Sequence, residues 1–136
     1  MDKQIVILAA GKGSRMNSDI PKVMLKVGGT PMLECVINNC SQVTNDLILV
    51  YSEHLEPYLP SFKNRCKLVH QEKQLGTAHA VAVAKNLFDP EQLIGVIYGD
   101  NPLITPNIIN GLFEHLQKTD SKAATLAFEY NKPNQY

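Results

Sequence analysis

The feature that most limits the fold is an apolar run close to the N-terminus. Residues Gln4–Ala10 read QIVILAA, are rich in β-branched side chains and end at Gly11. A run that is apolar at consecutive positions is typical of a strand buried on both faces, as in a parallel sheet covered by helices. It is much shorter than the ~20 residues of a membrane span. The chain is therefore expected to build an α/β core around this strand.

Further strand-like runs alternate with helix-like segments along the 136 residues. This alternation predicts a three-layer, doubly wound, mostly parallel sheet with helices on both faces. No linker or internal repeat interrupts it, so residues 1–136 are expected to form a single domain. The expected strands are Gln4–Ala10, Asp46–Tyr51, Cys66–His70, Leu93–Tyr98 and Lys122–Glu129, and the expected helices are Pro31–Val43, Thr77–Phe88, one beginning at Thr105-Pro106, and a short turn over Glu53–Leu59.

The helix assignments depend on apolar residues at the spacing that places them on one helical face. Thr30 is expected to cap the first helix, with Pro31 at its first position, and Thr77 is expected to cap the second. The first helix would bury Leu33, Val36, Ile37 and Cys40, and the last Ile108, Ile109, Leu112, Phe113 and Leu116.

Charge and cysteine content exclude several classes of protein. The 13 basic and 13 acidic residues cancel, which argues against a broad basic surface for nucleic acid. No apolar run is long enough to span a membrane, and the N-terminus has no signal-peptide layout. The three cysteines, Cys35, Cys40 and Cys66, form no CxxC pair, and an odd number argues against a disulfide framework. We expect them to be small buried hydrophobic residues in a protein of the reducing cytoplasm.

The loop after the first strand has a composition suited to phosphate. Residues 11–16 read GKGSRM, and Pro21-Lys22 follows shortly after. The glycines let the backbone present N–H groups to an anion, and Arg15 and Lys22 supply positive charge. The spacing matches neither a Walker A loop nor a dinucleotide fingerprint. A plain glycine-rich turn is the alternative interpretation.

Two further segments carry polar groups near expected strand ends. Asp100 follows the strand Leu93–Tyr98, where a single carboxylate could hold Mg²⁺ together with substrate phosphates, or could simply stabilise a turn. Gln71 and Gln74 offer paired amide donors and acceptors of the kind that a nucleobase edge requires, and Gly76 would let a flat base approach the backbone. A polar loop with a helix cap is the alternative for this segment.

Together, LAAGKGSRM with PK, QEKQLGTAHA and YGDNPLI resemble the motifs of sugar-1-phosphate nucleotidyltransferases, in the same order. The resemblance is strongest to the uridylyltransferase domains that begin the bifunctional enzymes of UDP-N-acetylglucosamine synthesis. It implies a Rossmann-like, glycosyltransferase-A-like fold, Mg²⁺ as cofactor, and UTP and a sugar-1-phosphate as ligands. The implied reaction transfers UMP from UTP to N-acetylglucosamine-1-phosphate and releases pyrophosphate. No nucleic acid or membrane partner is implied.

The resemblance also assigns roles to individual positions. Lys22 would neutralise the α-phosphate region, and Asp100 would hold Mg²⁺; with Arg15 these are the residues expected to act in catalysis. The backbone around the nucleotide would come from Leu8, Ala9, Ala10 and Gly11, the β- and γ-phosphate contacts from Gly13, Ser14 and Arg15, the uracil contacts from Gln71, Gln74, Gly76 and Thr77, and the ribose side from Tyr98 and Gly99.

The sequence departs from the family pattern at its C-terminal end. In the family, the region like Asn131–Tyr136 continues into a Gly-Arg stretch, the sugar-binding residues and a second metal ligand, and an acetyltransferase domain follows. None of these is expected in this chain, which would then be a truncated domain that binds nucleotide but turns over slowly or not at all alone. A homodimer, or completion by another chain, would fit an exposed sheet edge. A non-catalytic nucleotide-binding remnant and a nucleotidyltransferase for another phosphate substrate remain open alternatives.

Overall fold

The computed structural model describes residues 1–11, 19–127 and 129. Its centre is a four-stranded parallel sheet in the order β5-β4-β1-β6. β1, the first strand of the chain, lies between β4 and β6, so the chain winds outward from it in both directions. The strands are β1 (Lys3–Ala9), β4 (Leu47–Tyr51), β5 (Lys67–His70) and β6 (Leu93–Tyr98).

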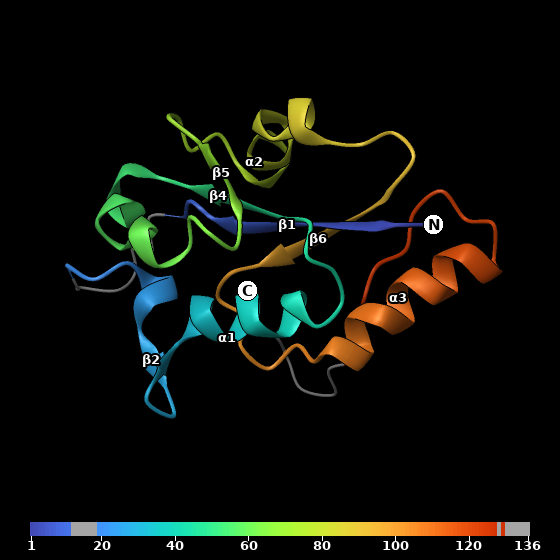
Figure 1. Cartoon of the computed structure of the whole chain (residues 1–136), viewed down its shortest axis with the longest axis horizontal. Coiled ribbons are helices and arrows are strands. Elements are labelled where there is room, and N and C mark those ends of the chain that lie inside the picture. Colours follow the sequence, from blue (N-terminus) through green and yellow to red (C-terminus); the bar gives the residue numbers. More distant parts are fainter. Residues whose placement is uncertain (12–18, 128, 130–136) are drawn as a thin grey trace.

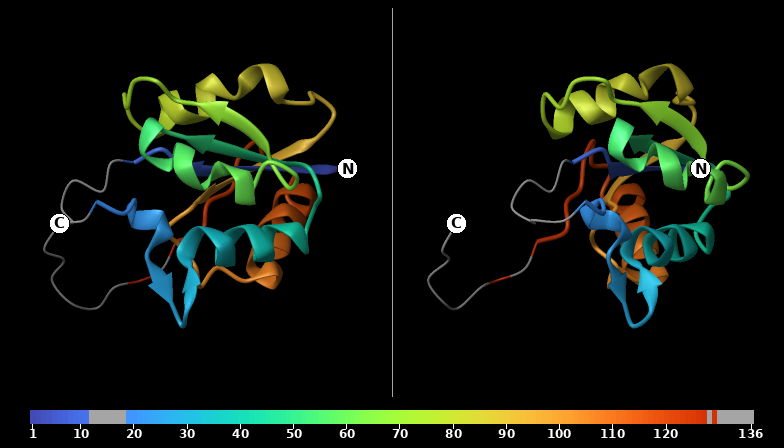
Figure 2. Two further views of the ribbon diagram at one scale, coloured as in Figure 1. Left: turned by 60° about the vertical axis from the view of Figure 1, so that its left-hand side comes forward. Right: turned by 90° about the vertical axis from the view of Figure 1, so that its left-hand side faces the viewer.

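Helices cover both faces of the sheet (Figure 1). α1 (Met32–Ser41) and α3 (Pro106–Lys118) lie on one face, and α2 (Thr77–Val83) lies on the other. The two further views keep this three-layer arrangement (Figure 2). The predicted doubly wound α/β fold is therefore confirmed. The described residues also form the 3₁₀ helices η1 (Lys22–Met24), η2 (Glu53–Ser61) and η3 (Lys85–Leu87).

The alternation of side chains along β1 explains why this strand is apolar at consecutive positions. Ile5 and Ile7 face a large core beneath α1 and α3, whereas Val6 and Leu8 face a smaller core beneath α2. All four are buried. Since successive side chains of a strand point to opposite faces, a strand between two helical layers must be apolar throughout.

Two helix starts differ from the predictions, although the helices themselves are present. Thr30 is the first residue of β3 (Thr30–Pro31), and Pro31 is the residue that precedes α1 without any side-chain cap. Gly76 caps α2 in place of Thr77. Thr105 does cap α3, since its Oγ1 accepts a bond from the backbone N–H three residues on, at 3.3 Å.

Helix lengths and faces also need correction. The helix predicted over Thr77–Phe88 ends at Val83 and gives way to η3. On α3, Ile109 and Phe113 are buried, but Ile108 is 40% exposed and lies at the side of the buried face. A short hairpin pairs β2 (Lys26–Val27) with β3 and was not predicted. Its turn is Gly28-Gly29, which adopts positive φ angles of 59° and 87°, where glycine carries little steric cost.

The strand predicted over Lys122–Glu129 is wrong. No strand is assigned over residues 122–127 or at Glu129, the part of this range that the structure describes, and those side chains are exposed. Residues 122–126 line a groove with β6 and α3 without joining the sheet. A strand needs hydrogen bonds to a neighbouring strand, and the local sequence alone does not show whether such a neighbour is present.

The cysteines behave as small buried hydrophobes where they reach the core. Cys40 and Cys66 are buried in the large core as free thiols, and Cys35 is half-buried. Burial raises the pKa of Cys40 to about 12 and that of Cys66 to about 11. Both therefore stay protonated near neutral pH. Within the described part of the chain, the helices are too short and too polar to cross a membrane.

Candidate functional site

A cleft of about 330 Å³ opens at the carboxyl ends of the strands. It lies beside the end of β1, where the chain winds to β4 on one side and to β6 on the other. In open α/β sheets, this reversal leaves a crevice between the loops that follow the neighbouring strands. The position of the cleft is therefore a direct consequence of the strand order.

The structure brings together most of the residues that the sequence singles out. Gly99 does not line the cleft, and Gly13, Ser14 and Arg15 lie outside the described residues. Val23 and Ala80 line the cleft without having been predicted. The predicted residues found in the lining are Leu8, Ala9, Ala10, Gly11, Lys22, Gln71, Gln74, Gly76, Thr77, Tyr98 and Asp100.

An ion pair crosses the charged side of the cleft. Lys22 Nζ lies 2.6 Å from Asp100 Oδ2, and the side chains are 44% and 34% exposed. Lys22 opens η1, whereas Asp100 follows β6, so the pair joins segments 78 residues apart. The cation predicted to bind phosphate and the carboxylate predicted to bind metal therefore contact each other. Asp100 Oδ1 has no partner among the residues that the structure describes.

The donor set suits a divalent cation only when a ligand contributes to it. Across the described residues, no three His, Cys, Asp or Glu side chains gather into a metal-binding group. Asp100 is the acidic residue in the described lining of the cleft. Mg²⁺ commonly keeps several waters and binds through one or two carboxylates plus substrate phosphates. Asp100 fits the role of a protein ligand in such a shared site.

The opposite wall of the cleft carries two glutamines. Gln71 is only 3% exposed, and its Nε2 lies 2.9 Å from His79 Nδ1 and 3.4 Å from the carbonyl oxygen of Gly76. Gln74 Nε2 donates to the backbone oxygen of Gln71 at 3.2 Å. Gly76 has a φ of 103°, a backbone conformation that residues other than glycine rarely adopt. This glycine lets the chain turn sharply from the glutamine segment into α2.

Gly99 allows the ends of β1 and β6 to approach each other closely. Its N–H donates to the carbonyl oxygen of Leu8 at 2.8 Å. A Cβ at this position would lie 3.1 Å from that oxygen and 3.2 Å from Leu33 Cδ1. The neighbouring Tyr98 is 53% exposed and lines the cleft. Gly99 therefore lets the ends of β1 and β6 lie close together, while Tyr98 lines the cleft.

Sequence reasoning missed His79 and Ala80, which come from the first turns of α2. Ala80 packs in the smaller core with Leu8, and its small side chain keeps α2 close to the sheet. His79 is half-buried against Gln71. The GTAHA motif contains both residues, but its spacing does not reveal which side chain the histidine contacts, because the contact spans a loop and a helix start.

A family model described as "MobA-like NTP transferase domain" matches residues 5–135. Curated relatives include the bifunctional protein GlmU of Zymomonas mobilis, 43% identical over 96% of this chain and 30% of the relative. The GlmU of Staphylococcus epidermidis is 41% identical over 100% of this chain and 31% of the relative. The chain thus spans about 30% of the length of these relatives.

Solved structures support the same fold at lower sequence identity. Rv0371c from Mycobacterium tuberculosis aligns with a TM-score of 0.74 and 22% identity, covering 88% of this chain and 62% of that one. The bifunctional IspDF from Campylobacter jejuni gives 0.69 and 23%, covering 87% and 31%. A nucleotidyl transferase from Methanothermobacter gives 0.72 and 20%, covering 84% and 57%. At these identities the alignments show a shared fold.

Proposed function

The chain belongs to the MobA-like NTP transferase domain family, and we propose that it binds UTP in the cleft for transfer of UMP to N-acetylglucosamine-1-phosphate. The products would be UDP-N-acetylglucosamine and pyrophosphate. The observation that carries this proposal is the meeting of Lys22 and Asp100 opposite the Gln71 wall in one cleft. The 43% identical relative is a GlmU, which favours uridine as the nucleoside.

The two walls would bind the two ends of the nucleotide. Gln71 and Gln74 provide amide groups for the pyrimidine edge, and Gly76 provides an unobstructed backbone beside it. Tyr98 lies on the opposite side, where the ribose would sit. The backbone of Ala10 and Gly11 would lie beside the phosphates.

The charged side of the cleft would serve the reacting phosphate. A phosphate oxygen of the sugar phosphate attacks the α-phosphorus of UTP, and the bond to the β-phosphate bridging oxygen breaks as pyrophosphate leaves. Lys22 would exchange its bond to Asp100 for one to the α-phosphate and so offset its charge. Asp100, freed of the ammonium, would hold Mg²⁺, which when bound offsets further phosphate charge. The rest of the chemistry is alignment, which needs no covalent intermediate.

Isothermal titration of UTP with Mg²⁺ into the purified chain tests the first half of the proposal. CTP and GTP serve as matched controls, and EDTA replaces Mg²⁺ in a further control. We expect binding of UTP in preference to CTP and GTP, and weaker binding without Mg²⁺. Absence of binding by all three nucleotides would contradict the proposal. A preference for CTP would favour a nucleotidyltransferase with another substrate.

A pyrophosphate-release assay with N-acetylglucosamine-1-phosphate tests the second half. Release that requires both UTP and the sugar phosphate would support the full reaction. Uridine-selective binding without release would favour a nucleotide-binding module that does not catalyse alone. Size-exclusion chromatography of the same sample would test the homodimer expected from the edge strand β6, which stays a prediction.

A further inference from the structure

Gln71 is held by hydrogen bonds at its backbone N–H, its backbone oxygen and its side-chain Nε2. Its backbone N–H donates to the carbonyl oxygen of Tyr51 at 2.8 Å, and its backbone oxygen accepts from Gln74 Nε2 at 3.2 Å. Its side-chain Nε2 contacts both His79 Nδ1 and the Gly76 oxygen. The residue is 3% exposed, yet it lines the cleft. Its amide is therefore fixed in place at the edge of the candidate site.

The partners of Nε2 determine which way the amide faces. The Gly76 carbonyl can only accept, so the amide NH₂ must lie on that side. An NH₂ group can only donate, so His79 Nδ1 must accept, which places the imidazole proton on Nε2 of the ring. The Gly76 carbonyl sets which end of the amide faces it, because a carbonyl can only accept, whereas Nδ1 of an imidazole accepts or donates according to its tautomer. With the proton on Nε2 of the ring, His79 holds the amide in that orientation through the shorter contact, at 2.9 Å.

The same geometry leaves Gln71 Oε1 for a ligand. Within the described residues this oxygen has no hydrogen-bond partner. Among the described residues, the buried side-chain atoms without a hydrogen-bond partner are Gln4 Oε1 and Gln92 Oε1, and Gln71 Oε1 is not one of them. An oxygen at this position accepts a hydrogen bond and cannot donate one. It would favour a base whose facing atom carries a proton.

We propose that His79 is a positioning residue that selects the uracil base by holding the Gln71 amide with Oε1 toward the ligand. Uracil carries a proton on N3, which Oε1 can accept, whereas cytosine presents a lone pair there. If the amide rotated by half a turn, its NH₂ would face the base and the preference would reverse. This inference rests on the proposed uridine-binding function.

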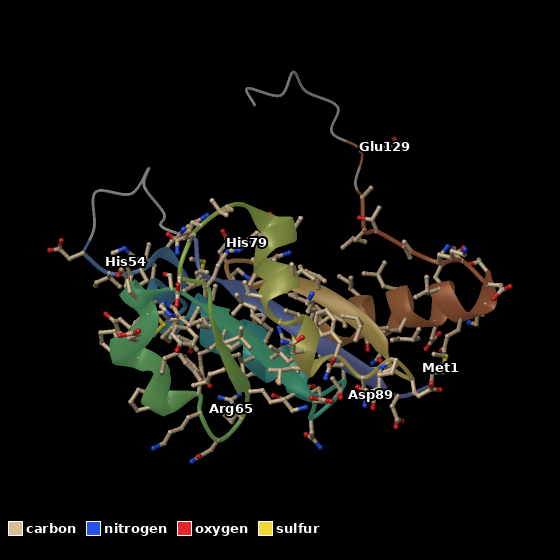
Figure 3. The ribbon with its side chains drawn as sticks, turned by 90° about the horizontal axis from the view of Figure 1, so that it is seen from above. Met1, His54, Arg65, His79, Asp89 and Glu129 are labelled. Carbon is tan, nitrogen blue, oxygen red and sulfur yellow. The ribbon has the colours of Figure 1, made fainter. Side chains whose placement is uncertain are left out.

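The location of His79 suits a positioning role. Figure 3 shows His79 on α2, which lies over the sheet. Ala80 and Ala84 of the same segment pack into the core with Val6 and Leu8, so the helix that carries the imidazole is anchored to β1. His79 itself does not line the cleft, so it acts through Gln71 and does not touch the ligand.

Two substitutions at one position separate positioning from packing. H79F keeps a ring of similar size but removes the acceptor. H79N places an amide oxygen close to the site of Nδ1 and restores an acceptor. The exposed His54 on η2 provides a matched control, H54F. Each variant and the wild type are titrated with UTP and with CTP in the presence of Mg²⁺, and their melting temperatures are measured.

We expect H79F to reduce the ratio of UTP to CTP affinity by about 5- to 10-fold, the loss that follows from one hydrogen bond between neutral groups. H79N is expected to recover most of this ratio, and H54F to leave it unchanged. A wild type that prefers UTP, with an unchanged ratio in H79F, would overturn the inference but leave the proposed function intact. A wild type that binds no nucleotide would instead overturn the proposed function. Equal loss of UTP and CTP affinity in H79F and H79N would mean that His79 only supports the fold.

Discussion

Two Lys–Asp pairs lie at opposite ends of the central sheet and look alike. At the carboxyl ends of the strands, Lys22 Nζ lies 2.6 Å from Asp100, with side-chain exposures of 44% and 34%. At the amino ends, Lys67 Nζ lies 2.7 Å from Asp46, with exposures of 52% and 24%. Neither the distances nor the exposures distinguish the two pairs. Ion pairs this exposed typically contribute only about 0–1 kcal/mol to stability.

The carboxylates differ in what else they bind. Asp46 uses both oxygens, because Oδ1 accepts from Lys67 and Oδ2 accepts from Gln4 Nε2 at 3.0 Å. Its backbone N–H also donates to Thr44 Oγ1. Asp100 uses Oδ2 alone, within the part of the chain that the structure describes, and it lines the cleft. The comparison shows that a carboxylate oxygen without a partner beside a cleft indicates a binding role better than the presence of an ion pair does.

Removal of the Lys22 ammonium group from the cleft should have the largest effect on nucleotide affinity. Lys22→Ala is expected to weaken UTP binding by about 10- to 100-fold, since a charge-assisted contact to phosphate contributes about 1.5–3 kcal/mol. Its melting temperature should stay near that of the wild type. Isothermal titration and a thermal melt measure the two quantities. Lys67→Ala is the matched control at the other end, and equal nucleotide affinities in the two variants would contradict the distinction.

Removal of the carboxylate at the amino ends should affect stability and leave binding unchanged. Asp46→Ala is expected to lower the free energy of unfolding by about 1–3 kcal/mol, because the buried Gln4 amide loses an acceptor. The amide would keep its bond to the Leu87 oxygen at 3.0 Å. Urea denaturation measures the change, with UTP titration alongside. A reduced UTP affinity in the folded variant would show that the two ends are not independent.

Neutralising the carboxylate in the cleft should alter metal dependence. Asp100→Asn is expected to remove most of the difference between UTP affinities with and without Mg²⁺, a change of about 10-fold if one metal ligand is lost. Stability should change by less than about 1 kcal/mol, since the pair is exposed. The measurement is a UTP titration in Mg²⁺ and in EDTA. A Mg²⁺ effect that persists in full would show that Asp100 is not the ligand.

Ionisation of the buried thiols should have the smallest effect on stability near neutral pH and a clear effect at alkaline pH. The folded pKa values of Cys40 and Cys66 are raised from 9.0 to about 12 and about 11. A raised pKa means that the neutral thiols contribute their full stability below pH 9, and that this stability is lost as the pH rises through the folded values. Urea denaturation between pH 7 and 11 should show a decline above pH 9. Cys66→Ala should make that decline shallower, and an unchanged slope would contradict the assignment.

The sequence predicted the helices and strands that depend on a local pattern of apolar residues. Its predictions were wrong where the structure depends on a partner that is distant in the sequence. The run Gln4–Ala10 predicted β1 and its burial, because a strand between two layers needs apolar residues on both faces. The last strand, Lys122–Glu129, could not be judged from composition, since pairing depends on which strand lies beside it. Gly76 replaced Thr77 as the cap of α2, because the tight turn needs a positive φ.

The sequence predicted most of the residues that line the candidate site, but not the contacts between them. The motifs that follow the strands indicated the residues that line the cleft, because the carboxyl ends of parallel strands lie at the same edge of the sheet. The bond between Lys22 and Asp100 joins two motifs 78 residues apart, and the bond between Gln71 and His79 spans a loop and a helix start. Such contacts depend on the packing of whole elements, which single motifs do not encode.

The strand order β5-β4-β1-β6 also bears on how the molecule assembles. Along the sequence, β4 and β5 extend the sheet on one side of β1, and β6 extends it on the other side. The cleft takes Gln71 from the first winding and Asp100 from the second, so it exists only after both have docked. A nucleotide in it would hold the two windings together and stabilise the fold by about 2.7 kcal/mol at a hundred times its dissociation constant. Gain of nucleotide binding during refolding would therefore report the moment at which both sides of the sheet have docked on β1.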